Sequence, residues 1–157
     1  MSIPNFKAVN EWLYRGGQPD KDGFAQLKDL GVKTIVCLRR STEIRSVQRK
    51  EAEAMGFEYI SIPLSYFNFP SDAEVEKFFS IVNSPTRRPV FVHCKHGSDR
   101  TGMMIAFYRM TNDGWSVEEA YAEMESSGFH KMFVYHYKFA VFRYARRLAL
   151  KQSNGSS

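Results

Sequence analysis

Short apolar runs alternate along the chain with segments of helical periodicity, and turn-forming residues separate them. An apolar run of four to six residues bounded by polar or turn residues is typical of a buried strand. The first run ends at the turn Gly16–Pro19, which is rich in residues that break regular structure. Four strands are therefore predicted, at Trp12–Arg15, Lys33–Leu38, Tyr59–Ile62 and Pro89–His93.

The segments between these runs have the signals of helix starts and stops. Ser71 with Glu74, and Ser116 with Glu119, have the spacing of capping boxes, in which side chains satisfy the first backbone N–H groups of a helix. The segment Thr101–Asn112 is apolar nearly all round, which predicts a central, buried helix. The predicted helices lie near Gly23–Leu30, from Thr42 to Met55, after Ser71, at Thr101–Asn112, after Ser116, and from about Met132 to Leu150.

Alternating strands and helices favour a mostly parallel sheet with helices on both faces. With 157 residues, of which 43% are hydrophobic and 25% charged, the chain has the composition of one globular domain. We therefore predict a single α/β domain at residues 1–152, with a central sheet of four to five strands flanked by helices. Residues 153–157 are expected to be a flexible tail.

The net charge of +5 comes from the C-terminal part of the chain. Residues 1–125 carry 16 Lys and Arg against 17 Asp and Glu, whereas residues 126–157 carry six basic residues and no acid. Such a surface attracts anionic partners, or is simply the solvated face of a terminal helix.

No apolar run approaches the roughly 18 residues of a membrane span. The N-terminus has no signal-peptide pattern. The sequence as written predicts a cytoplasmic protein, or a secreted or periplasmic one if a signal peptide was removed.

The segment VFVHCKHGSDRTG places Cys94 at the end of a buried strand and Arg100 at the start of the buried helix. The N–H groups of a tight loop and the N-terminus of a helix together form an anion site. The same field favours the thiolate of Cys94, and Arg100 can bind two phosphoryl oxygens with its planar fork. Gly97 and Gly102 relieve steric limits on the loop and on helix packing. The alternative is a buried, inert cysteine beside a capping arginine.

The motif HCKHGSDRTG resembles the signature loop of cysteine-based protein tyrosine and dual-specificity phosphatases, and LYRGGQP is similar to their compact atypical branch in bacteria, fungi and plants. The resemblance covers roughly residues 12–125. It implies a dual-specificity phosphatase-like fold, a cysteinyl-phosphate intermediate on Cys94, and Arg100 on the phosphate oxygens. The loop amides from Lys95 to Arg100, including those of His96, Gly97, Ser98 and Asp99, would surround the phosphate. Thr101 would ease turnover of the thiolate, and His93 would support the loop.

The general acid of this family usually lies on a separate loop, where this chain has no acid before Asp72. Asp72 directly follows the cap residue Ser71, where an acid stabilises a helix start. Asp99 is the preferred candidate, because a carboxylate inside an anion-binding loop is electrostatically costly. The D-R-T ending resembles myotubularins and some lipid-active bacterial tyrosine phosphatases, in which this Asp is the proposed acid. Alternatively, Asp99 pairs with a neighbouring Arg or caps the helix.

Basic residues around the motif indicate a substrate with several phosphates. Lys95 resembles its counterpart in phosphoinositide phosphatases, the His96–Gly97 pair resembles RNA 5′-triphosphatases, and the LYRGGQP branch includes inositol phosphate enzymes. Arg39, Arg40 and Arg45 follow a strand at the sheet edge where α/β sites lie, although they can equally be solvated charges. Tyr66, Phe67 and Phe69 would wall the pocket or simply pack.

The main hypothesis is therefore a phosphatase for an inositol polyphosphate or phosphoinositide. The alternatives are a protein tyrosine or dual-specificity phosphatase acting on a phosphoprotein, an RNA 5′-triphosphatase-like activity, and a non-catalytic phosphate-binding module.

No stable nucleic-acid partner, transmembrane segment or cofactor is expected. His93, Cys94 and His96 lack a fourth ligand with suitable spacing, so no metal is expected either. Cys37, inside KTIVCL, is predicted to belong to the core rather than to a disulfide.

Overall fold

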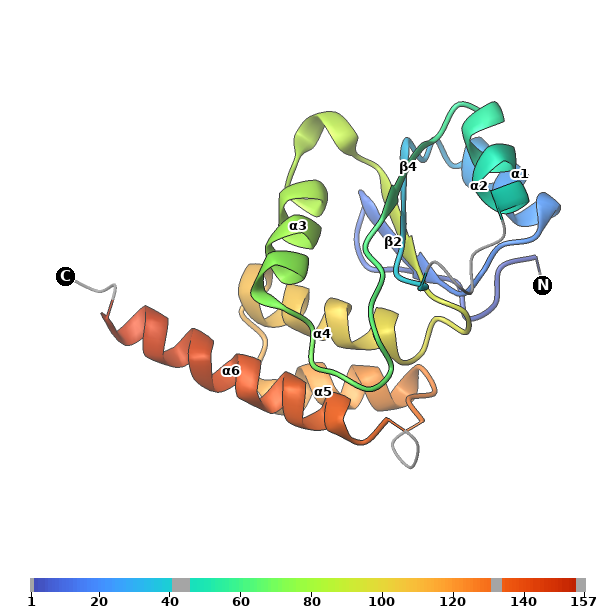
Figure 1. Ribbon diagram of the computed structural model, residues 1–157. Coiled ribbons are helices and arrows are strands. Elements are labelled where there is room, and N and C mark those ends of the chain that lie inside the picture. The colour runs from blue at the N-terminus through green and yellow to red at the C-terminus, as the bar shows by residue number, and fades with distance from the viewer. Residues whose placement is uncertain (1, 41–45, 131–133, 155–157) are drawn as a thin grey trace.

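The computed structural model describes residues 2–40, 46–130 and 134–154, and its centre is a five-stranded sheet in the order β1-β2-β5-β3-β4 (Figure 1). β2, β5, β3 and β4 are parallel, and β1 pairs with β2 in the antiparallel direction at one edge. The strands are β1 Lys7–Ala8, β2 Leu13–Gly16, β3 Thr34–Cys37, β4 Glu58–Ser61 and β5 Val90–His93.

The register of the sheet brings three loops to one edge. Gly16 of β2 and Cys37 of β3 both pair with His93, the last residue of the central strand β5. The segments that follow these strands therefore start side by side at the carboxyl end of the sheet. In open α/β sheets this edge is where ligands bind.

Helices cover both faces of the sheet, and Figure 1 shows α1 and α2 on one side and α3, α4, α5 and α6 on the other. Parallel strands need these crossover helices because the end of one strand and the start of the next lie at opposite edges of the sheet. The helices are α1 Lys21–Asp29, α2 Ser46–Ala54, α3 Asp72–Val82, α4 Arg100–Asn112, α5 Val117–Ser126 and α6 His136–Asn154, with a short 3-10 helix at Pro85–Arg87.

The side chains of the central strand alternate between two apolar clusters. Val90 and Val92 pack with α3–α6, whereas Phe91 packs with α1 and α2, because successive side chains of a strand point to opposite faces. Cys94 belongs to the first cluster and Cys37 to the second. Both cysteines are buried and free. Cys37 is thus a core residue, as predicted.

The predicted fold class is confirmed, and both predicted capping boxes are present at Ser71 and Ser116. The edge strand β1 and the 3-10 helix were not predicted, because each is too short to show a periodic pattern. Part of the helix predicted from Thr42 lies outside the described residues, and α2 begins at Ser46. The last helix continues to Asn154, so Ser153 and Asn154, expected in the tail, are helical.

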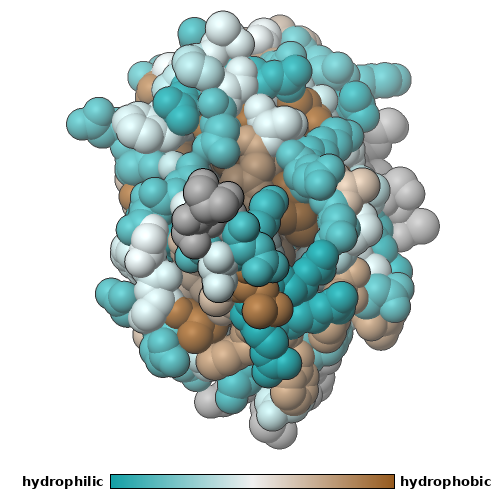
Figure 2. Space-filling model, turned by 90° about the vertical axis from the view of Figure 1, so that its left-hand side faces the viewer, coloured by the Kyte–Doolittle hydropathy of each residue, from teal (hydrophilic) through white to brown (hydrophobic). Residues whose placement is uncertain are grey.

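A groove of about 1020 Å³ runs between α3 and α6, over α4. Its apolar lining comes from Val75 and Phe79 of α3, Phe107 of α4, and Tyr144 and Leu148 of α6. Figure 2 views the molecule from the left-hand side of Figure 1 and shows apolar side chains in a hollow ringed by hydrophilic ones. Within the described residues, no helix is long and apolar enough to cross a bilayer.

Candidate active site

Cys94 directly follows the central strand and is 1% exposed. The backbone N–H of Gly97 donates to its Sγ at 3.3 Å, so the loop turns back on the sulfur within three residues. The loop ends at Asp99, and Arg100 begins α4. The sequence predicted this strand–loop–helix order. It places a sulfur, converging backbone N–H groups and a helix N-terminus in one small volume, which suits an anion.

The 94–99 loop is packed against the segment that follows β2. Gly97 has a φ of +79°, and a Cβ at this position would lie 2.5 Å from the carbonyl carbon of Gly16. A Cβ at Gly17 would lie 2.7 Å from the carbonyl oxygen of Lys95. The N–H of Gln18 donates to that same oxygen at 3.0 Å. The glycines of the GGQP turn are therefore required because two backbones touch there.

Arg15 of β2 also holds the loop, and sequence reasoning missed it. It is 2% exposed, and its Nη2 donates to the carbonyl oxygen of Gly97 at 2.8 Å. Burial lowers the pKa of Arg15, while the negative charges of Glu123 and Cys94 act in the opposite direction. The available signal was an arginine at the end of an apolar strand, since a buried arginine needs an acceptor or an anion nearby.

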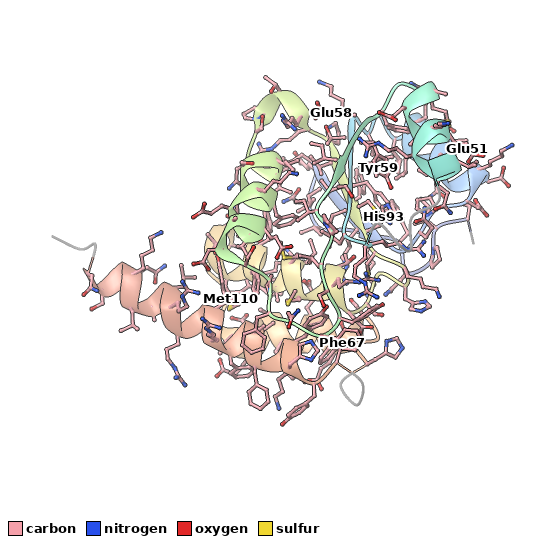
Figure 3. The ribbon with its side chains drawn as sticks, viewed as in Figure 1. Glu51, Glu58, Tyr59, Phe67, His93 and Met110 are labelled. Carbon is pink, nitrogen blue, oxygen red and sulfur yellow. The ribbon has the colours of Figure 1, made fainter. Side chains whose placement is uncertain are left out.

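His93, the last residue of the central strand, contacts the loop through the backbone of Cys94. Figure 3 shows it at the lower end of the central strand, inside the molecule. Its Nδ1 lies 3.1 Å from the carbonyl oxygen of Cys94, and its ring stacks on Phe91 with centroids 5.5 Å apart. Burial, together with the smaller effect of the charges of Arg39 and Arg100, lowers the pKa of His93 to about 4, against the opposing hydrogen bond with Cys94. The ring is therefore neutral near pH 7.

Arg100 is completely buried and is oriented by an aromatic residue from a distant segment. Its Nη2 donates to the hydroxyl of Tyr66 at 3.0 Å, and its guanidinium carbon lies 4.1 Å from the centre of that ring. Tyr137 of α6 is also buried and donates its hydroxyl hydrogen bond to the carbonyl of Ser65. Figure 1 shows the segment between β4 and α3 passing in front of α4. Tyr66 thus has a defined place beside Arg100, which the sequence left open.

Asp99 is 4% exposed, and its partner is His130. The backbone N–H of His130 donates to Oδ1 at 2.8 Å, and the ring Nδ1 lies 2.9 Å from Oδ2. The Asp99 side chain makes no capping hydrogen bond to α4. The pairing with a neighbouring arginine or the helix cap, considered as alternatives, is replaced by a contact with a residue 31 positions away.

Asp72 lies elsewhere, on the groove between α3 and α6. Its side chain is 71% exposed, and its two oxygens each accept a hydrogen bond from Arg147 of α6 at 3.2 Å. These hydrogen bonds and the charge of Arg147 lower the pKa of Asp72. No residue from 94 to 101 is among the described residues that line this groove.

Three further predicted residues are buried beside the loop. Thr101 is completely buried and Ser98 is 3% exposed, and neither hydroxyl has a hydrogen-bond partner among the described residues. Gly102 allows α5 to approach, since a Cβ there would lie 3.1 Å from Cγ of Met124. These positions show that the second half of the loop and the start of α4 are tightly packed.

The predicted basic residues divide into two groups. Lys95 and His96 are exposed on the 94–99 loop. Arg39 is tied to the neighbouring turn, because its Nη1 donates to Oε1 of Gln18 at 3.0 Å. Arg40 lies over the exposed ring of Phe67, with 5.9 Å between the guanidinium carbon and the ring centre. Arg45 lies outside the described residues.

Comparison with known proteins gives a family match over residues 1–140, to a family described as a DSP-PTPase phosphatase fused to NAD+ kinase. The dual-specificity protein phosphatase TpbA of Pseudomonas aeruginosa is 32% identical over 126 residues, which are 80% of this chain and 55% of that protein. Inositol diphosphatase DSP4 of Arabidopsis thaliana is 26% identical over 67% of this chain and 54% of that protein. The chain thus spans about half the length of these curated relatives.

The fold is also found in solved structures. The crystal structure of TpbA from P. aeruginosa has a TM-score of 0.74 at 29% identity and covers 94% of this chain and 92% of that one. A cysteine-to-serine variant of TpbA was solved in complex with phosphotyrosine, and it has a TM-score of 0.73 at 27% identity, with 92% and 90% coverage.

Replacing Gly97 by Ala tests the contact between the two loops. We expect weaker binding of tungstate, an inorganic oxyanion, by at least about tenfold, because the new Cβ displaces the loop from Gly16. Isothermal titration calorimetry measures this. Gly31→Ala is the matched control, because Gly31 has a φ of +80° but nothing within 4 Å of the new Cβ. It should lower the free energy of unfolding by about 1 kcal/mol and leave tungstate binding unchanged. Equal binding by both variants would contradict this account.

The buried neutral His93 predicts acid sensitivity. Because its folded pKa of about 4 lies below the unfolded value, the unfolded state binds a proton first as pH falls. The free energy of unfolding should therefore fall as pH drops below about 6.5, and this decrease should end near pH 4. At about 1.4 kcal/mol per pH unit, this residue accounts for about 2 kcal/mol between pH 7 and pH 5. Urea unfolding of the wild type and of His93→Gln measures the difference, and an unchanged pH slope in the variant would contradict the prediction.

Proposed function

Because the chain belongs to the DSP-PTPase phosphatase family, we propose that it hydrolyses phosphomonoesters through a cysteinyl-phosphate intermediate on Cys94. The observation that carries this proposal is the position of the sulfur. It is buried at the base of the 94–99 loop, receives the N–H of Gly97, and shares that site with the buried Arg100. A thiolate in such surroundings is a nucleophile that is already directed at a bound phosphoryl group.

In the first step the Cys94 thiolate attacks phosphorus, and the bond from phosphorus to the leaving oxygen breaks. Arg100 binds two phosphoryl oxygens, and its contact with Tyr66 fixes the plane of its guanidinium group before substrate arrives. Donors that are oriented in advance stabilise the transition state without reorganisation during the reaction. The loop amides from Lys95 to Asp99 supply the other hydrogen bonds to the phosphoryl group.

In the second step water attacks the phosphocysteine, and inorganic phosphate leaves. The thiolate is the leaving group, so donors near sulfur help this step. Gly97 N–H is such a donor, at 3.3 Å. We propose the same for the hydroxyl of Thr101, which is buried next to the loop with no other partner among the described residues.

Protonation of the leaving oxygen depends on Asp99 rather than Asp72. Asp99 is part of the loop that holds the nucleophile, and it is 4% exposed. Asp72 is mostly exposed and is engaged by Arg147 on a separate groove. The carboxylate closer in sequence and in structure to the sulfur therefore supports the proton transfer.

For the substrate we propose an inositol polyphosphate or a phosphoinositide. Lys95 and His96 are exposed on the loop, where they can reach a second phosphate. Arg39 lies beside the neighbouring turn. Inositol diphosphatase DSP4 is a relative at 26% identity. Hydrogen bonds that involve charged groups contribute about 1.5–3 kcal/mol each, so a second phosphate would be strongly selected.

The second candidate is a protein phosphatase for phosphotyrosine or other phosphoresidues. It is favoured by the relationship to TpbA, which is named a dual-specificity protein phosphatase and has been solved with phosphotyrosine. The exposed ring of Phe67, 77% accessible, could pack against a peptide. Both candidates use the same chemistry at Cys94 and differ in what surrounds the phosphate.

Cys94→Ser should abolish phosphate release and retain substrate binding, because the loop amides and Arg100 remain. Malachite-green assays and calorimetry measure the two properties. Cys37→Ala is the control, since Cys37 lies in the cluster on the other face of the sheet, and it should keep the wild-type rate. Turnover by Cys94→Ser within about tenfold of the wild type would exclude the covalent mechanism.

Comparing kcat/KM across phosphates tests the substrate class. Inositol hexakisphosphate and phosphoinositides should exceed a phosphotyrosine peptide and triphosphate-ended RNA, and their kcat/KM should fall steeply as salt screens the basic loop. Lys95→Gln should reduce this preference and its salt dependence. A preference for the phosphotyrosine peptide that does not depend on salt would instead support the protein phosphatase.

Asp99→Asn and Asp72→Asn distinguish the two carboxylates. We expect Asp99→Asn to slow inositol hexakisphosphate hydrolysis by about 100- to 10,000-fold and an activated aryl phosphate far less, because that leaving group needs little protonation. Asp72→Asn should leave both rates unchanged and lower stability slightly through its ion pair with Arg147. The reverse pattern would assign the acid to Asp72.

A further inference from the structure

His130 contacts Asp99 through two different groups. Its backbone N–H donates to Oδ1 at 2.8 Å, and its ring Nδ1 lies 2.9 Å from Oδ2 and 3.2 Å from Oδ1. Both carboxylate oxygens are therefore occupied by the same residue. Because an ionised carboxylate only accepts hydrogen bonds, Nδ1 carries a hydrogen in this contact, and the other ring nitrogen, Nε2, points away from Asp99.

The two residues differ in accessibility. The side chain of Asp99 is 6% exposed, whereas that of His130 is 49% exposed. The ring of His130 lies edge-on to that of His96, with 6.0 Å between centroids, and His96 is an exposed residue of the 94–99 loop. A leaving group that departs from the loop into solvent can therefore reach the imidazole more easily than the buried carboxylate.

We propose that His130 delivers the proton to the leaving oxygen and that Asp99 is the positioning residue that orients its ring. The proposal rests on the phosphatase function above and refines its acid step. A carboxylate that fixes the tautomer and direction of an imidazole by accepting from Nδ1 is an effective arrangement for proton transfer at Nε2. It also explains why the loop contains a buried carboxylate that does not cap the helix.

The protons balance over the cycle. As the Cys94 thiolate attacks phosphorus, the bond to the leaving oxygen breaks, and that oxygen takes the Nε2 proton of the His130 imidazolium. The ring becomes neutral and keeps its Nδ1 hydrogen on Asp99. Neutral Nε2 then accepts a proton from the water that attacks the phosphocysteine. The bond from phosphorus to sulfur breaks, the thiolate and inorganic phosphate are released, and His130 is an imidazolium again.

Among the described residues, the charged and titratable groups around the ring come from the loop and from α4. Asp99 and His96 lie beside it, and the charges of Lys95 and Arg100 act on His96. Burial lowers the pKa of His96, and the charges of Lys95 and His130 lower it further. Burial therefore disfavours a competing proton on His96.

His130→Asn separates proton delivery from positioning. The amide nitrogen of Asn can take the place of Nδ1 and still donate to Asp99, and the backbone N–H is unchanged, but no Nε2 proton remains. If His130 is the donor, this variant slows inositol hexakisphosphate hydrolysis by about 100- to 10,000-fold and 4-nitrophenyl phosphate by less than about fivefold. The basic limb of its pH–rate profile for kcat/KM should also be lost. His136→Asn, a histidine of α6 stacked on Phe69, is the control and should match the wild type.

The Asp99 variants complete the test. Asp99→Asn should show the same dependence on the leaving group, and the double variant Asp99→Asn/His130→Asn should be no slower than His130→Asn alone. A His130→Asn variant with wild-type rates on both substrates would overturn the proposal and leave Asp99 as the direct donor. Wild-type protein that releases phosphate from neither substrate would instead refute the phosphatase function. Nitrogen-15 NMR of His130 is independent of turnover, and a ring without an Nδ1 hydrogen would also overturn the proposal.

Discussion

The contact between the backbones of Gly97 and Gly16–Gly17 is the constraint on which the rest of the site depends. A Cβ at Gly97 or Gly17 would come within 3 Å of the facing backbone, so the two loops can pack together only if both positions are glycine. The contact exists because β2 and β5 are parallel and end in register, at Gly16 and His93. Arg15 adds a hydrogen bond to the Gly97 carbonyl from the same strand. The sheet thus fixes the shape of the loop around the sulfur.

Two buried arginines and a neutral histidine set the charge of this region. Arg15 comes from β2 and Arg100 from α4, and each is held by an acceptor, the Gly97 carbonyl and the Tyr66 hydroxyl. Burial keeps His93 neutral, so it adds no charge near the sulfur. Burying cations is costly unless an anion compensates for it. A site with this composition is therefore suited to an anion, which is what the proposed phosphatase function requires.

The segment between β4 and α3 contacts the arginine at the start of α4. Its residue Tyr66 orients Arg100, and Tyr137 of α6 holds the preceding residue Ser65. On the 94–99 loop, Asp99 meets His130, and this is the pair to which we assign the proposed acid step. α5 and α6 lie on one face of the sheet (Figure 1), and His130, which comes between them in the sequence, reaches the loop that follows the central strand.

The sequence by itself determined the elements and the local part of the site. The apolar runs, the two capping boxes and the Cys94–Arg100 segment are contiguous, and their structure follows from backbone hydrogen bonding and side-chain periodicity over a few residues. Arg15, Tyr66 and His130 could not be assigned from it, because their partners lie 82, 34 and 31 positions away. Which distant side chains meet depends on how loops and layers pack against one another. Only the tertiary structure decided these contacts. A pattern over a few residues cannot predict a contact between two side chains that are far apart in the sequence and meet only when the elements pack.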